Sequence, residues 1–300
     1  MSITIDRLTK KYGTFAAVND VTIEIPAGSV FGLLGPNGAG KTTTFKCLLG
    51  MAAPTSGTIA FDGKPLTPRT FERLSYVPER SALYEWMSVT EHLEMQRRAF
   101  SRYNAKRAAE LLDLFQLDKR KRVSRMSKGM RTALAVVLAF STEPELMVLD
   151  EPTSGLDPVN QRSVLKLIID ASAQGSTIVL SSHQIGQVER AADHIAVLKD
   201  GRIVLAGVVD ELKSDSKIVE GIFETETVSF NGLATDARIT RMERTGRIVR
   251  FTVKSGSDAI ASQLSAMGAQ SVRIVDLNLE DIFLNAVDPA AVTADVVGSV

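Results

Sequence analysis

The chain has little cysteine, tryptophan or histidine, and it carries no net charge. Its 300 residues include one cysteine, one tryptophan and three histidines. The lone thiol, Cys47, excludes an internal disulfide, so we expect a buried packing residue in a reducing compartment. Because 35 Lys and Arg balance 35 Asp and Glu, no overall field directs the protein to nucleic acid or to an anionic membrane.

Long apolar runs are also missing. The best, residues 133–140, covers eight positions, whereas a helix needs about 20 to span a bilayer. We expect this stretch to be a buried helix. The first residues alternate like a strand and lack the basic-then-apolar pattern of a signal peptide. The sequence therefore predicts a protein that does not enter the membrane by itself.

A glycine-rich loop, residues 35–43, fits the pattern G-x-x-x-x-G-K-[ST]. Glycines let backbone N–H groups point inward at phosphates, and the following helix adds its positive N-terminal end. Lys41 supplies a cation for the β- and γ-phosphates, and the Thr42 hydroxyl is suited to ligate Mg²⁺. The loop lies between a predicted strand, Val30–Leu34, and a helix ending near Gly50. Its predicted nucleotide contacts are Asn37, Gly38, Ala39, Gly40, Lys41, Thr42 and Thr43.

Two acids end a second apolar run. Asp150 and Glu151 follow residues 146–149, a run typical of a parallel strand covered on both faces. In a phosphate-loop protein the first carboxylate holds Mg²⁺ and the second orients or deprotonates the attacking water. The alternative is a pair of solvated acids at a strand end.

Strands and helices alternate over residues 1 to about 215. We expect strands at 2–8, 21–25, 177–182 and 195–198, a helix from Pro158 to about Ala173, and a helical region at about 88–140. Ser88 or Thr90 would cap the first of those helices. The pattern predicts an α/β layered core with a helical insertion.

Composition changes near residues 210–220. Alternating Val249, Phe251 and Val253, a helix at 258–267 and a strand at 271–275 predict a small α+β accessory domain at 217–288. Residues 289–300 are predicted to be a flexible tail.

His183 follows the predicted strand 177–182, at the sheet edge where ligands of open α/β folds collect. It could hydrogen-bond the γ-phosphate. For His92 and His194 we expect ordinary packing roles. The basic run 119–122 has no interleaved aromatics, so a solvated surface is favoured over a nucleic-acid site.

Together these motifs resemble the ATP-binding subunit of an ABC transporter over residues 2–215. The resemblance implies a P-loop NTPase core with an antiparallel β subdomain and a helical subdomain. Ser127, Lys128 and Gly129 resemble the start of the family's signature segment, which caps the γ-phosphate of ATP held by a partner subunit. Residues 154–157 match the D-loop, where Asp157 would also cap a helix that begins at Pro158.

Two further positions would contact the nucleotide, and one departs from the family. Tyr12 matches the aromatic residue that stacks on adenine, and we expect Val18 to pack nearby. Glu79 stands where the family usually has Gln, a Mg²⁺ ligand, and a carboxylate can still bind the ion. Residues 80–87 would dock on a membrane partner, with local core packing as the alternative. Residues 277–284 resemble the end of bacterial ABC ATPases that serve exporter-type (ABC-2) permeases.

The sequence therefore predicts an ATPase that uses ATP and Mg²⁺, with Glu151 as general base and Lys41 and His183 stabilising charge. Two copies, identical rather than different, would enclose ATP and drive export through a separate permease at the cytoplasmic face of the membrane. One rival is a soluble ABC-type ATPase acting on ribosomes or DNA. The other is a phosphate-loop kinase.

Overall fold

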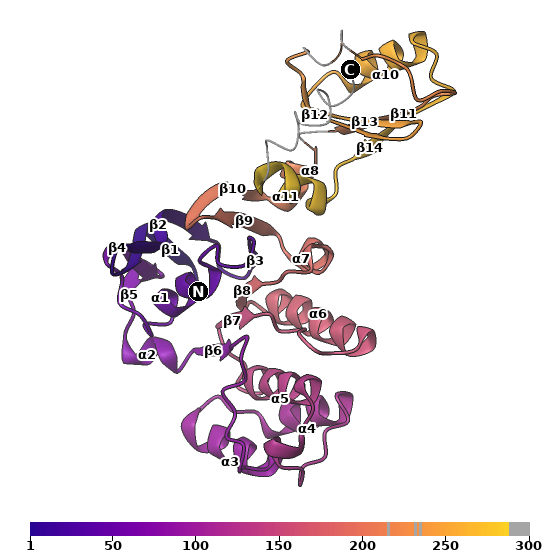
Figure 1. The fold of residues 1–300 in the computed structure, drawn as a ribbon. Coiled ribbons are helices and arrows are strands. Elements are labelled where there is room, and N and C mark those ends of the chain that lie inside the picture. Colours follow the sequence, from indigo (N-terminus) through magenta and orange to yellow (C-terminus); the bar gives the residue numbers. More distant parts are fainter. Residues whose placement is uncertain (215–216, 231–232, 234–235, 288–300) are drawn as a thin grey trace. The chain divides into compact units, whose positions relative to one another are not determined.

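The computed structural model describes residues 1–214, 217–230, 233 and 236–287 (Figure 1). The chain divides into two compact units between Ala206 and Gly207, and each unit is described by itself. The tail predicted at 289–300 lies outside the described residues.

The first unit carries the nucleotide-loop region. Its elements are β1 (Ile3–Tyr12), β2 (Phe15–Ile25), β3 (Val30–Leu34), α1 (Lys41–Leu48), β4 (Ser56–Phe61), β5 (Lys64–Pro65), α2 (Pro68–Phe71), β6 (Leu74–Val77), α3 (Val89–Ala99), α4 (Ala105–Leu114), the 3₁₀ turn η1 (Val123–Arg125), α5 (Lys128–Phe140), β7 (Leu146–Asp150), α6 (Pro158–Ala173), β8 (Thr177–Ser181), α7 (Ile185–Ala191), β9 (His194–Lys199) and β10 (Arg202–Val208), which runs into the second unit.

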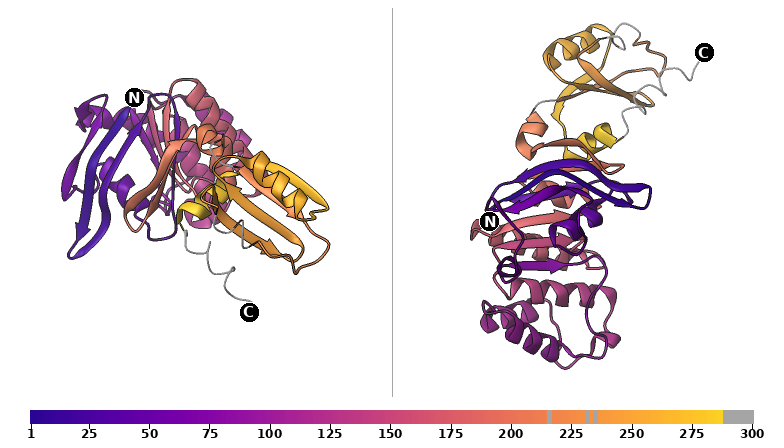
Figure 2. Two further views of the ribbon diagram at one scale, coloured as in Figure 1. Left: turned by 90° about the horizontal axis from the view of Figure 1, so that it is seen from above. Right: turned by 90° about the vertical axis from the view of Figure 1, so that its left-hand side faces the viewer.

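A six-stranded sheet forms the centre of this unit, in the order β10-β9-β3-β8-β7-β6. The pairs β9–β3, β3–β8, β8–β7 and β7–β6 are parallel. Every residue of β3, β7 and β8 is buried, because α1 and the antiparallel strands cover one face and α6 and α7 the other (Figures 1 and 2). The expectation of strands buried on both faces is confirmed.

The second sheet of this unit is antiparallel, in the order β2-β1-β4-β5. Its inward residues, including Ile5 and Val21, share one core with Phe45 of α1 and with Phe31 and Val148 of the central sheet. Hydrophobic burial across this core fixes the phosphate-loop helix between the two sheets.

Helices α3, α4 and α5 form a group at the opposite end of this unit from β1 and β2 (Figures 1 and 2). The predicted helical region 88–140 is thus three α-helices and one 3₁₀ turn. Ser88, rather than Thr90, caps α3: its side chain accepts from the Glu91 N–H, and the Glu91 carboxylate accepts from the Ser88 N–H at 2.6 Å.

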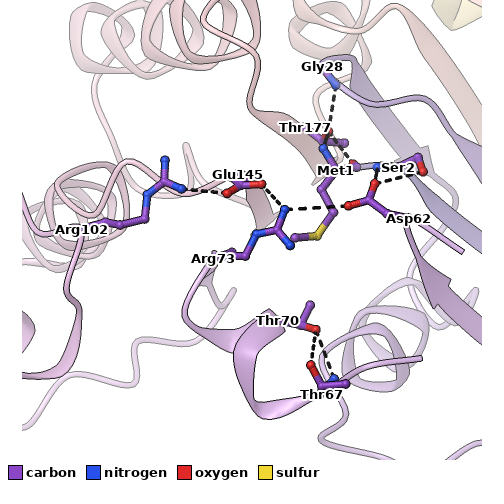
Figure 3. Close-up of polar contacts among 10 residues, drawn as sticks. All are labelled: Met1, Ser2, Gly28, Asp62, Thr67, Thr70, Arg73, Arg102, Glu145 and Thr177. Carbon is purple, nitrogen blue, oxygen red and sulfur yellow. Dashed lines mark hydrogen bonds and ion pairs between the residues drawn. The ribbon is translucent and has the colours of Figure 1, made fainter. Parts of the chain in front are cut away.

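A carboxylate at the start of β7 ties the parts of this unit together (Figure 3). Glu145 pairs with Arg73, just before β6, and accepts from Arg102 of the helical group at 2.8 Å. Arg73 also lies 3.8 Å from Asp62, which follows β4. These contacts lie at the end of β7 opposite Asp150.

The second unit contains α8 (Val209–Ser214), β11 (Lys217–Ile222), β12 (Ile239–Thr245), β13 (Ile248–Val253), α10 (Ser257–Ala266), β14 (Ser271–Asp276) and α11 (Leu279–Val287). The strands form an antiparallel sheet in the order β12-β13-β11-β14. Helix α10 packs on the sheet at β11 and β14, and its Ile260 and Leu264 share one core with Val249, Phe251 and Val253.

Within the described residues, no helix is both long and apolar enough to cross a membrane.

Candidate functional site

Four strand ends deliver the predicted site residues to one edge of the central sheet. The glycine-rich loop follows β3, Glu79 follows β6, Asp150 ends β7, and His183 follows β8. Because these strands are parallel, their carboxyl ends meet at the same edge. A cleft of about 500 Å³ opens there. It is lined by Tyr12, Phe15, Ala17, Asn37, Gly38, Ala39, Gly40, Lys41, Thr42, Thr43, Glu79, Asp150 and Glu151.

Gly40 lets the loop turn tightly into α1. Its φ is +109°, and a Cβ there would lie 2.3 Å from the Ala17 carbonyl oxygen. A side chain would therefore be strained and would collide with backbone. The N–H of Gly201, in the turn between β9 and β10, donates to the Ala39 carbonyl at 3.0 Å. This hydrogen bond attaches the glycine-rich loop to that turn.

Lys41 begins α1 and folds back over its own loop. Its Nζ donates to the Gly35 carbonyl at 2.6 Å and to the Pro36 carbonyl at 3.2 Å. Burial lowers the pKa of this ammonium, while Glu151, Asp150 and Glu79 oppose that shift. The cation is thus held at the loop on carbonyl partners that phosphate oxygens can replace.

Asp150 is held from two sides. Its carboxylate accepts from the Thr42 hydroxyl at 3.0 Å and from the Ser181 hydroxyl at 2.5 Å. The side chain is 2% exposed, and the two donors supply the hydrogen bonds that a buried carboxylate requires. Thr42 and Asp150 thus present adjacent hard oxygen donors, the ligand type that Mg²⁺ prefers.

Glu151 and His183 form a pair across the strand ends. The Nδ1 of His183 lies 2.7 Å from the Glu151 Oε2. Burial raises the pKa of the Glu151 carboxyl, and the contacts with His183 and Lys41 oppose the shift. Glu151 also has a φ of +54°, an uncommon conformation for a side-chain-bearing residue and one that occurs at functional sites.

The aromatic end of the cleft comes from the β1–β2 hairpin. Tyr12 is 51% exposed and Phe15 65% exposed, and the two pair across the turn. Val18, which we placed near adenine, is fully buried in the core between the sheets and does not line the cleft. The exposed aromatic surface of the cleft is therefore formed by Tyr12 and Phe15.

The signature segment contacts the D-loop. Ser127 caps α5 by accepting from the Met130 N–H at 3.2 Å. A Cβ on Gly129 would lie 2.4 Å from the Gly155 carbonyl oxygen, and the Lys128 stem packs beside Gly155. Asp157 caps α6 and accepts from the Val159 and Asn160 N–H groups at 2.9 and 3.0 Å.

Neither segment borders the cleft that holds Lys41. Among the described residues, its lining includes none of Ser127, Lys128, Gly129 and Asp157.

Hydrogen bonds lower the pKa of the Asp157 carboxyl. They come from the backbone N–H groups of Asn160 and Val159 and from the Asn160 side chain.

Comparison with known proteins agrees with this geometry. The family model described as ABC transporter matches residues 18–154. The uncharacterized ABC transporter ATP-binding protein YhaQ of Bacillus subtilis (strain 168) is 33% identical over 95% of this chain and 98% of its own length. The chain belongs to the ATP-binding subunits of ABC transporters.

Other relatives of this ABC subunit have named roles. The Nod factor export ATP-binding protein I of Cupriavidus metallidurans is 35% identical over 92% of the chain and 93% of its own length. A solved structure described as the ATP binding subunit of an ABC transporter is 33% identical, with a TM-score of 0.67 over 71% of this chain and 92% of that one. The predicted fold and the function as a transport ATPase are confirmed.

Sequence reasoning missed one residue that lines the cleft of this ABC subunit, Phe15, and one buried residue behind it, Ser181. Ser181 holds Asp150 and ends the buried strand β8, directly beside the end of β7. A polar residue at the end of an apolar strand was the available signal. Phe15 lies two residues beyond the Gly13 turn, and an exposed aromatic opposite Tyr12 would have indicated it.

Proposed function

We propose that two copies of this ABC ATPase close head to tail, each ATP lying between Lys41 of one copy and Ser127 of the other. The supporting observation is that Gly129 lies against Gly155 of the D-loop and that neither Gly129 nor Ser127 lines the cleft. A hydroxyl at a helix N-terminus suits the γ-phosphate, so a second chain would complete the site. ATP would then favour the closed dimer and its hydrolysis the open one.

Glu151 acts as the general base in this proposal. Its pKa is raised by burial, which strengthens it as a proton acceptor, and His183 holds its carboxylate at 2.7 Å. Lys41 and His183 stabilise charge on the γ-phosphate. Tyr12 stacks on the adenine, with Phe15 beside it.

The same cleft suits Mg²⁺, which supplies charge neutralisation at the phosphates when bound. Thr42 and Asp150 would hold it, with Glu79 on the cleft wall as a further oxygen donor. The donor set is all oxygen, as this ion requires.

A membrane permease is the second proposed partner, bound at the cytoplasmic face of the membrane. Residues 80–87 would dock on it, because Tyr84 is 44% and Trp86 68% exposed. Beside them an apolar cavity of about 340 Å³ opens between the helical group and β6. Export is the favoured direction, since the relative from Cupriavidus serves Nod factor export and residues 277–284 resemble exporter-type subunits.

The decisive variant is Glu151→Gln. We expect ATP hydrolysis to fall by a factor of about 10³ or more, because the base is lost, while ATP still binds and drives dimer formation. Light scattering after gel filtration, with and without ATP and Mg²⁺, measures the dimer. Unaltered hydrolysis, or a variant that stays monomeric with ATP bound, would contradict the proposal.

A further inference from the structure

The docking segment 80–87 contacts a buried histidine that the ATPase site does not use. His92 lies in the first turn of α3 and is 1% exposed. Its Nδ1 is 2.9 Å from the Ser88 carbonyl oxygen, and its Nε2 is 3.1 Å from the Tyr84 backbone nitrogen. Both ring nitrogens are therefore engaged by backbone groups.

These two partners define the state of the ring. A backbone N–H can only donate, so Nε2 accepts from Tyr84 and carries no proton. Nδ1 then carries the proton and donates it to the Ser88 carbonyl. The hydrogen-bond network thus assigns one neutral tautomer, whose acceptor faces the docking segment.

The hydrogen bond to His92 comes from Tyr84, the first residue of an exposed aromatic pair with Trp86. The ring of Tyr84 stacks near His92, with centroids 6.2 Å apart and planes at 28°. Trp86 follows, with its ring centroid 5.0 Å from that of Tyr84. Residues 81–84 belong to no helix or strand, so the bond to His92 fixes the backbone at the point where the aromatic surface leaves the core.

The segment is also attached to the helix that bears Ser127. The Ser124 N–H donates to the Glu85 carbonyl at 3.0 Å, and the Arg131 guanidinium of α5 contacts the Glu85 carboxylate at 3.3 Å. His92 thus holds one side of the segment on α3, while η1 and α5 hold the other. A partner that presses on Tyr84 and Trp86 therefore acts on a surface joined to both helices.

We propose that His92 is a positioning residue that sets the orientation of Tyr84 and Trp86 for the membrane partner. That the partner is a membrane permease rests on the function proposed above. The contact between His92 and Tyr84, which we call the clamp, does not depend on that function. His92 acts through the Tyr84 N–H and is not among the described residues that line the cleft. Its removal reduces stimulation by the permease and leaves the basal ATPase of the isolated subunit unchanged.

Trp86 is the only tryptophan in the sequence, so its fluorescence in the isolated, full-length chain reports on this segment alone. His92→Phe keeps a ring and removes the acceptor. We expect lower Trp86 anisotropy, greater quenching by acrylamide, and exchange of the Tyr84 amide proton roughly tenfold faster, as for the loss of one hydrogen bond.

Two amide variants separate the clamp from general packing. In His92→Gln the side-chain oxygen can replace Nε2 and should restore the Trp86 signal, whereas His92→Asn reaches only the Nδ1 position and should not. Asn104→Ala is the matched control, since it removes the cap of α4 in the same helical group at a cost of about 1 kcal/mol. Asn104→Ala should leave the anisotropy and the acrylamide quenching of Trp86 unchanged.

The clamp is refuted if His92→Phe and His92→Asn keep wild-type anisotropy and Tyr84 exchange. The consequence for coupling is then measured on the complex purified from membranes, as the ratio of its ATPase rate to that of the isolated subunit. We expect His92→Phe to lower this ratio several-fold and His92→Gln to preserve it. A wild-type ratio of one would instead overturn the proposed permease function, and the fluorescence result would stand separately.

Discussion

At the scale of single residues, the proposed role of Glu151 as general base makes turnover depend on pH. Burial raises the pKa of Glu151 above the ordinary 4.5, so the protonated form persists to higher pH than in an exposed glutamate. The base must be ionised, and ATPase activity should therefore fall on acidification at a pH above 4.5. The dependence of kcat/KM on pH, which reports the free enzyme, measures this acidic limb.

Replacing His183 should shift the acidic limb of the pH–activity profile in a defined direction. Because its hydrogen bond and charge lower the pKa of Glu151, His183→Ala should shift the acidic limb to higher pH in addition to lowering kcat. His183→Gln, which can still donate to the carboxylate, should shift it less. An acidic limb that does not move in His183→Ala would exclude Glu151 as the titrating base.

The same raised pKa affects stability with a defined sign. Between the unfolded and folded pKa values of Glu151 the folded state binds more protons, so its contribution to stability falls as pH rises through this window. Glu151→Gln removes that penalty at neutral pH. The loss of activity in this variant should thus occur without a loss of thermal stability.

Glu79 adds a negative charge to the wall of the cleft. Glu79, Asp150 and Glu151 line it, and Lys41 is the one Lys or Arg side chain among the described residues of this lining. Glu79→Gln should tighten ATP binding about three- to tenfold, because one repulsive charge is removed at close range. Titration with a fluorescent ATP analogue measures the Kd. Glu72→Gln, an exposed site at the end of α2, is the control, and equal affinities in the two variants would show that Glu79 does not face the phosphates.

At the scale of elements, the start of α5 and the D-loop fit together only without a side chain at position 129. The nearest atom to an added Cβ is a backbone oxygen, 2.4 Å away, so Gly129→Ala must displace one segment. We expect ATPase activity to fall at least tenfold while nucleotide binding at the loop of residues 35–43 persists.

Gly186 provides the matched control for that substitution. It also lies in a helix, α7, and an added Cβ would meet nothing within 4 Å. Gly186→Ala should be neutral or stabilising by about 0.5–1 kcal/mol. Thermal unfolding and ATPase assays compare the pair, and equal activities would disprove the close fit of α5 to the D-loop.

Local signals explain which elements could be predicted. Helix α6 runs from Pro158 to Ala173 as expected, since Asp157 caps it, Pro158 suits its first position and Gly175 follows its end. The sequence pattern does not show where the helices within 88–140 end, although Asn104 caps α4 by accepting from the Arg107 N–H at 2.9 Å. Its breaks depend on contacts distant in sequence, such as the Asn104 N–H bound to the Ser141 carbonyl at 2.7 Å.

The residues of the site also fall into those that the sequence indicates and those that only the fold reveals. The loop at 35–43, Asp150 and Glu151 are contiguous motifs whose strand context is readable, and the structure brings them together on one cleft. Val18 does not line the cleft, because the alternation of β2 turns its side chain into the core. Ser181 meets Asp150 only because β7 and β8 lie side by side, and its place at the end of an apolar strand is the one hint in the sequence. His92 contacts Tyr84 and Ser88, which are close in sequence, but the path of the irregular segment 81–84 could not be read from the pattern.

At the scale of the whole molecule, the proposed head-to-tail dimer makes the cleft and the signature segment two halves of one site. Ser127→Asp tests this arrangement and keeps the fold. Aspartate caps a helix as well as serine does, so α5 is preserved, yet a carboxylate there would face the γ-phosphate held by the other copy. In the Glu151→Gln background we therefore expect ATP to bind the monomer normally but to produce no dimer in light scattering. Ser127→Asn, which caps without charge, should still dimerise. If both variants dimerise equally well, Ser127 does not face the nucleotide of a second chain, and the head-to-tail dimer is wrong.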